Sequence, residues 1–137
     1  MIIENIERDF KQKVFEKINI KSEGINRYRV FAPFVFNDGD NLSIIIKKEN
    51  GKWLLSDEGH TYMHLPYNFK DNDLQCNKIQ KIIDNVLSFF GVQDREGELI
   101  VPIEDDSYGD AFFRFVQAIL RIVEGIYFSE KKFNRRF

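Results

Sequence analysis

The stretch from residue 42 to residue 56 constrains the fold of this chain most. Asn50-Gly51 separates two apolar runs, and both central residues of the type I′ turn that joins tight hairpins need positive φ. A two-residue turn also fixes which residues of the two strands face each other. The expected pairs are Glu49 with Lys52, Lys48 with Trp53, Ile46 with Leu55 and Ile45 with Ser56.

A polar corner follows the second strand of this hairpin. It consists of Ser56, Asp57, Glu58, Gly59, His60 and Thr61. Asp57 or Ser56 is expected to cap a short helix after Gly59 by accepting hydrogen bonds from free backbone amides. If Asp57 is the cap, Asn should fill the role about as well. Acids, a hydroxyl and an imidazole could also carry chemistry. These six residues are therefore the candidate functional corner.

The run from Gly51 to Thr61 carries a family resemblance. It reads Gly-Lys-Trp-Leu-Leu-Ser-Asp-Glu-Gly-His-Thr, and an Ala32-Pro33-Phe34 strand lies upstream. This pattern of apolar residue, Ser or Thr, Asp, acid, Gly, any residue and Thr resembles the family called domain of unknown function 1828. The resemblance implies a bacterial or phage origin, and the family has no assigned activity.

The rest of the chain indicates an α+β fold. Apolar residues at helical spacing predict an amphipathic helix over residues 3–18, packed on a sheet, and further helices at 79–90 and 108–128. Residues 19–26 are expected to form a loop, and residues 27–36 a strand that Pro33 places at an edge or bulge. A second hairpin is expected over 92–103. The prediction is a mostly antiparallel sheet of three to five strands against three main helices.

Length and composition bound the possibilities further. The 137 residues, of which 43% are hydrophobic, predict one domain over 1–130, with 131–137 as a mobile basic tail. A net charge of −2 argues against a general nucleic-acid binder. The single cysteine, Cys76, excludes an intrachain disulfide and fits a reducing, cytoplasmic setting. We find no secretory signal and no membrane-length apolar run.

Several residues are candidate ligands or contacts. His60 and His64 lie four apart and could make a metal site with Asp57 or Glu58. Neither a His-Glu-x-x-His pattern nor a third, distant ligand cluster is visible, so no metal and no cofactor are predicted. The acidic turn at 37–41 lacks the closing Glu of a calcium loop. Arg27 and Arg29, beside aromatic residues, are candidate contacts for single-stranded nucleic acid, although strand arginines more often solvate an edge.

The sequence is compatible with two functions from different classes. The first is a non-enzymatic protein-interaction module, which would bind an unidentified protein partner or form a homo-oligomer through its apolar last helix. The alternative is a metal-dependent hydrolase or nuclease that uses the acidic corner Asp57-Glu58. The direction in which the corner side chains point distinguishes these hypotheses.

Overall fold

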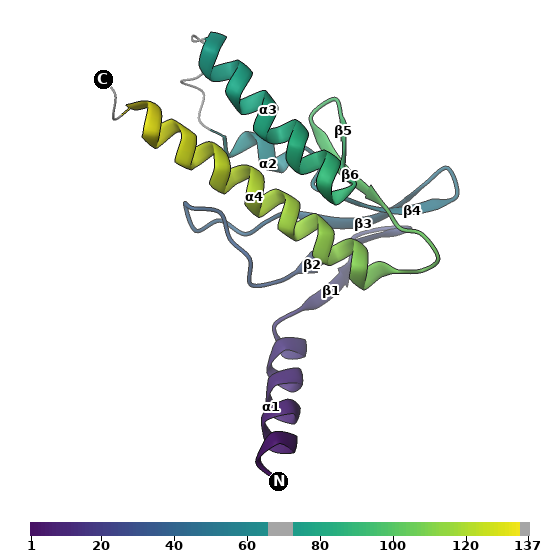
Figure 1. The fold of residues 1–137 in the computed structure, drawn as a ribbon. Helices are drawn as coiled ribbons and strands as arrows, with labels where there is room; N and C mark the ends of the chain where they lie inside the picture. The colour runs from purple at the N-terminus through teal and green to yellow at the C-terminus, as the bar shows by residue number, and fades with distance from the viewer. Residues whose placement is uncertain (66–72, 135–137) are drawn as a thin grey trace.

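The structure is a computed structural model (Figure 1). It describes the backbone of residues 1–65 and 73–134 and their side chains except those of 73–76 and 130–134. The elements in chain order are α1 (Ile2–Glu16), β1 (Asn19–Ser22), β2 (Arg27–Phe31), β3 (Ile44–Glu49), β4 (Lys52–Ser56), α2 (His60–Met63), α3 (Asp73–Phe90), β5 (Gln93–Arg95), β6 (Glu98–Pro102) and α4 (Tyr108–Asn134). Cys76 and the end of the basic tail lie outside the described side chains.

The predicted central hairpin is present. Asn50 and Gly51 have φ values of 52° and 78°, as the turn requires. All four expected pairs are found, with Glu49 opposite Lys52 at the turn. The second hairpin is also confirmed, because β5 and β6 pair across a turn at Glu96-Gly97.

The strands form one antiparallel sheet in the order β1-β2-β3-β4-β6-β5. The α+β class is thus confirmed, but the expected strand and helix numbers were too low. Within the described ranges there are six strands and four helices. The fourth helix is the single turn of α2, which was expected after Gly59 but was not counted among the three main helices. The added strand is β1, which is exposed along its whole length and therefore shows no apolar alternation in the sequence.

The core lies between one face of this sheet and the helices α3 and α4, which run side by side across it (Figure 1). The sheet contributes side chains that face the helices, namely Ile44, Leu55, Leu99 and Val101. Phe115 of α4 belongs to the same core. The helices approach closely where Gly125 of α4 meets Ile82 of α3, since a Cβ added at Gly125 would lie 3.1 Å from the Ile82 Cγ2 atom.

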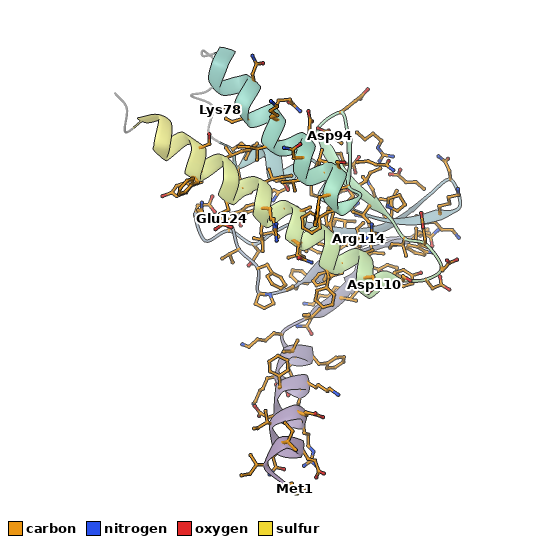
Figure 2. All side chains as sticks on the ribbon, viewed as in Figure 1. Met1, Lys78, Asp94, Asp110, Arg114 and Glu124 are labelled. Atoms are coloured by element: carbon orange, nitrogen blue, oxygen red, sulfur yellow. The ribbon has the colours of Figure 1, made fainter. Side chains whose placement is uncertain are left out.

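The first helix departs from its prediction. Its amphipathic pattern is real, but α1 buries no residue and does not pack on the sheet. Figure 2 shows its side chains standing clear of the rest of the molecule. Periodicity reports only that one face of a helix is apolar, and it does not say what covers that face.

Two further boundaries differ from expectation. Strand β2 ends at Phe31, before Pro33, and only an isolated bridge between Val35 and Asn41 continues the pairing. Pro33 has no N–H to donate to a neighbouring strand, which explains the early end. At the other terminus α4 continues to Asn134, so four residues of the predicted tail are helical. None of the described helices has the length and hydrophobicity needed to cross a membrane.

Candidate functional site

Asp57 occupies the centre of the corner and is fully buried. Its Oδ1 atom accepts hydrogen bonds from the amides of Gly59 and Leu99, both at 2.8 Å, and its Oδ2 atom accepts one from Thr61 at 3.1 Å. The carboxylate therefore caps α2 and also ties the corner to β6. Gly59 has φ +81°, a conformation that suits glycine. The Asp57 carboxylate thus serves to hold backbone amides in place.

The side chains of Ser56 and Glu58 point to the sheet face opposite α3 and α4. The hydroxyl of Ser56 donates to Glu98 and accepts from the amide of Glu58. The Glu58 carboxylate accepts two hydrogen bonds from Arg27, and the Nζ atom of Lys47 lies 3.5 Å from it. Arg27 is the main reason that the pKa of Glu58 is lowered.

This face carries a continuous charged network. Lys47 lies 2.7 Å from Glu98 and 3.2 Å from Glu49, and Arg95 bonds both of these carboxylates. Burial alone would raise the pKa of Glu98, but hydrogen bonds from Lys47, Ser56 and Arg95 lower it to about 2. Opposite charges alternate along the network, so it presents little net charge.

The two candidate nucleic-acid contacts belong to the same network. Arg27 pairs with Glu58, and Arg29 lies 2.7 Å from a Glu23 oxygen. Glu23 also lies 3.9 Å from Arg27. Both guanidinium groups are thus neutralised by neighbouring acids, whereas binding of a phosphate backbone needs cations available to it.

His60 points to a different place, where it meets His64 at the end of α2 and two acids from the turn after β2. Asp40 comes from the turn after β2, and its Oδ2 atom lies 3.6 Å from His60 Nε2 and 3.1 Å from His64 Nε2. Asp38 from the same turn lies 2.9 Å from His64 Nδ1. We call Asp38, Asp40, His60 and His64 the histidine–acid cluster.

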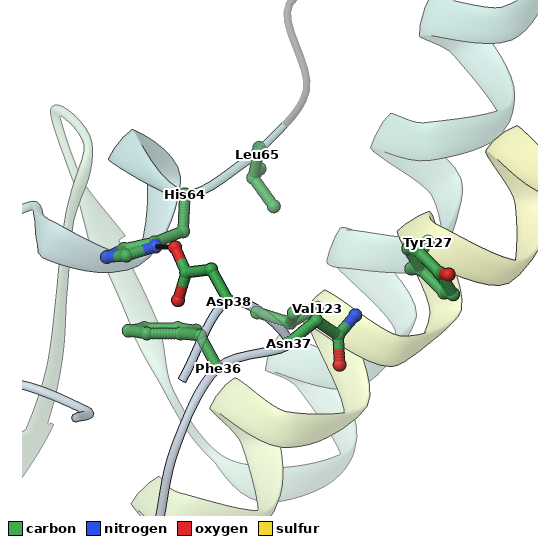
Figure 3. Close-up of a pocket in the computed structure, with 7 residues that line it drawn as sticks. All are labelled: Phe36, Asn37, Asp38, His64, Leu65, Val123 and Tyr127. Carbon is green, nitrogen blue, oxygen red and sulfur yellow. Dashed lines mark hydrogen bonds and ion pairs between the residues drawn. The ribbon is translucent and has the colours of Figure 1, made fainter. Parts of the chain in front are cut away.

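An aromatic ring and a hollow border this cluster. Phe36 stacks on His64, with ring centroids 4.0 Å apart and planes inclined by 15°. Figure 3 shows the Asp38–His64 contact beside Phe36, at the rim of a hollow of about 200 Å³ that reaches Val123 and Tyr127 on α4. Hydrogen bonding to the amide of Asp40, and to a lesser extent to His64, lowers the pKa of Asp38 against a smaller opposing effect of burial.

The predicted corner therefore does not form one cleft. Asp57 faces backbone amides, Glu58 faces the charged network and His60 faces the histidine–acid cluster. Sequence reasoning paired the two histidines with Asp57 or Glu58 and missed Asp38 and Asp40. Both acids lie in a segment that the sequence predicts to be a turn. Asp40 and His60 are far apart in the sequence, so no local pattern indicates that they are in contact.

A comparison with family models places the chain in a known group. The model described as "Domain of unknown function DUF1828" matches residues 32–122, which is more than half of the chain. The chain belongs to this family. The match begins after β2, so α1 lies before it, while the corner and the histidine–acid cluster lie within it. No curated protein and no solved structure matches the chain.

Proposed function

We propose that this DUF1828 chain is a protein-interaction module without catalytic activity, and that two copies associate by pairing their α1 helices antiparallel. The observation that carries the proposal is the uncovered apolar stripe of α1. Ile3 and Phe10 of this stripe are 57% and 67% exposed. Burying each large apolar side chain contributes roughly 1.5–3 kcal/mol, so a partner that covers the stripe gains considerable free energy.

The charges of α1 favour a second copy as that partner. The first half of the helix is mostly acidic and the second half mostly basic. The acids are Glu4, Glu7 and Asp9, the bases are Lys11 and Lys13, with Lys17 at the C-cap just after the helix, and the exceptions are Arg8 and Glu16. Antiparallel pairing sets the acidic half of one helix against the basic half of the other, which is complementary.

The apolar positions fit the same arrangement. When two helices are aligned antiparallel about a point between residues 8 and 9, Ile3 of one copy faces Val14 of the other. Glu4 then faces Lys13, and Ile6 lies beside Phe10. The last helix is a weaker candidate interface than the sequence indicated, because α4 buries most of its apolar side chains in its own fold.

The alternative, a hydrolase or nuclease at Asp57-Glu58, has less support. Its acids point to separate surroundings, and the Asp57 carboxylate is already engaged by three amides. Catalytic metal sites need carboxylates that converge on one point. The bacterial or phage origin and the cytoplasmic location stay predictions from the sequence.

Light scattering over a range of protein concentrations tests the self-association. We expect a concentration-dependent dimer for the parent and a monomer for Phe10→Asp, because a buried carboxylate at the helix interface is costly. Gln12→Asp introduces the same charge two residues away, on the polar side of α1, and should dimerise nearly as the parent does. A parent that stays monomeric at every concentration would contradict the proposal.

A charge exchange tests the direction of pairing. Glu4→Lys alone should weaken the dimer, by about twofold to tenfold, because it faces Lys13 of the other copy with a like charge. Adding Lys13→Glu to the same chain should restore the parent affinity. Restoration fails if the two helices run parallel or if α1 binds a different surface, and that result would overturn the antiparallel arrangement.

A further inference from the structure

The histidine–acid cluster brings three metal-ligating atoms to one point from two segments. Asp40, His60 and His64 each offer one ligand atom, and these three atoms all lie within 4.8 Å of one another. The histidines lie in and directly after α2, and Asp40 lies in the turn after β2. A helical turn sets the two imidazoles side by side, since residues four apart share a face.

The two carboxylate–imidazole separations fit a tetrahedral ion. Zinc bonds of about 2.0–2.1 Å at the tetrahedral angle place neighbouring ligand atoms about 3.3 Å apart. The Asp40 Oδ2 atom lies 3.1 Å from His64 Nε2 and 3.6 Å from His60 Nε2, on either side of that value. Two imidazoles with one carboxylate suit zinc-like transition metals, whereas calcium and magnesium prefer oxygen alone.

The surroundings orient His64 as a ligand. When Asp38 accepts the Nδ1 proton across 2.9 Å, the lone pair of Nε2 faces Asp40. Two acceptors at 3.1 Å repel each other unless a cation or a proton lies between them. Phe36 fixes the plane of the ring by stacking on it. A carboxylate behind a histidine is the usual second layer of a metal site.

From these contacts we infer that Asp40, His60 and His64 bind a zinc-like divalent transition-metal ion, with Asp38 as the positioning residue behind His64. Three protein ligands leave a fourth position for water or another ligand. The site is open to solution, because Asp40 and His60 also line a second hollow of about 400 Å³. The inference is independent of the dimer proposed above.

Zinc titration of the full chain tests the site. The protein is first treated with EDTA and freed of the chelator, and zinc chloride is then added in a calorimeter. We expect saturable binding of one ion per chain and a higher melting temperature with zinc, because a ligand of the folded state stabilises it. The chain has two histidines, so imidazole nitrogen NMR assigns the ligands directly, and the Nε2 signals of both should shift.

Variants separate ligands from bystanders. Asp40→Asn should lower zinc affinity by about tenfold or more, and Asp38→Asn should lower it by about tenfold with the one-to-one stoichiometry retained. Asp110→Asn removes the same charge from an exposed position on α4 and should bind zinc as the parent does. If Asp40→Asn does not fold, as circular dichroism would show, the partly exposed His60→Gln takes its place and should also lose affinity.

Two results would overturn the inference. One is the absence of saturable zinc binding, which would mean that a proton on His64 Nε2, donated to Asp40, takes the place of the ion. The other is zinc binding that leaves both imidazole signals unchanged, or that is equal in the parent and Asp40→Asn, which would place the ion elsewhere. Weaker binding in Asp40→Asn with normal binding in Asp110→Asn would establish the site.

Discussion

At the scale of single residues, Asp57 shows how one side chain can hold two distant elements together. Its carboxylate takes three backbone amides, two in the corner and one at Leu99 of β6. A cap expected from sequence alone would take amides only from its own helix. These three bonds explain why this acid can be fully buried with no cation paired to it among the described residues.

The third amide changes the expectation for Asp57→Asn. An Asn side chain has one oxygen, so its NH₂ group would face an amide donor such as that of Thr61. We now expect Asp57→Asn to lose about 1–3 kcal/mol of unfolding free energy, and Asp57→Ala to lose at least as much. Urea denaturation measures both, with the exposed Asp110→Asn as control. An Asn variant as stable as the parent would show that the corner relaxes around the amide.

At the scale of elements, α4 has two kinds of phenylalanine within one helical turn. Phe115 is fully buried in the core and Phe113 is 60% exposed. Phe115→Ala should therefore cost about 3–5 kcal/mol of unfolding free energy, whereas Phe113→Ala should stay within about 0.5 kcal/mol of the parent. Equal losses in urea denaturation would mean that the exposed side of α4 is covered in solution, for example by another copy.

At this scale, the features that could be predicted from the sequence are those that neighbouring residues determine. The hairpin register followed from two adjacent residues, Asn50 and Gly51, and was found as expected. The position of α1 depends on a surface elsewhere, so an amphipathic pattern could not supply it. Strand β1 is an exposed edge without apolar alternation, and therefore resembled a loop.

In the candidate site, too, the local feature could be predicted and the non-local one could not. The capping role of Asp57 could be read from its place before Gly59, because a cap is a local device. The cluster of Asp38, Asp40, His60 and His64 required two segments to meet, and a turn of acids has no periodicity that points to a histidine. Sequence reasoning supplied the histidine pair but could not supply its partners.

At the scale of the whole molecule, the charged network crosses the sheet and couples stability to pH. Glu98 is central to it, with a pKa near 2 in the fold and about 4.3 in an unfolded chain. Because the folded pKa is the lower one, the carboxylate stabilises the fold above about pH 4.3. This stabilisation is lost as the pH falls from about 4.3 toward 2.

A comparison of variants isolates that contribution. Glu98→Gln should be less stable than the parent near neutral pH, and the difference should shrink as the pH is lowered through this window. Urea midpoints at a series of pH values measure it. Glu124→Gln, at an exposed position on α4, should show a small difference that does not change with pH. A gap for Glu98→Gln that persists unchanged at low pH would argue against a charge effect.

The two outer strands of the sheet bear on how the molecule behaves at high concentration. Strand β1 has four residues and β5 has three, and all of them are exposed. Short edges that carry Lys21 and Arg95 offer a poor template for an incoming strand. Fibril growth by strand addition is thereby discouraged at both sides of the sheet. If α1 pairs between copies as proposed, contact between copies is directed to closed helix pairs and away from open-ended stacking.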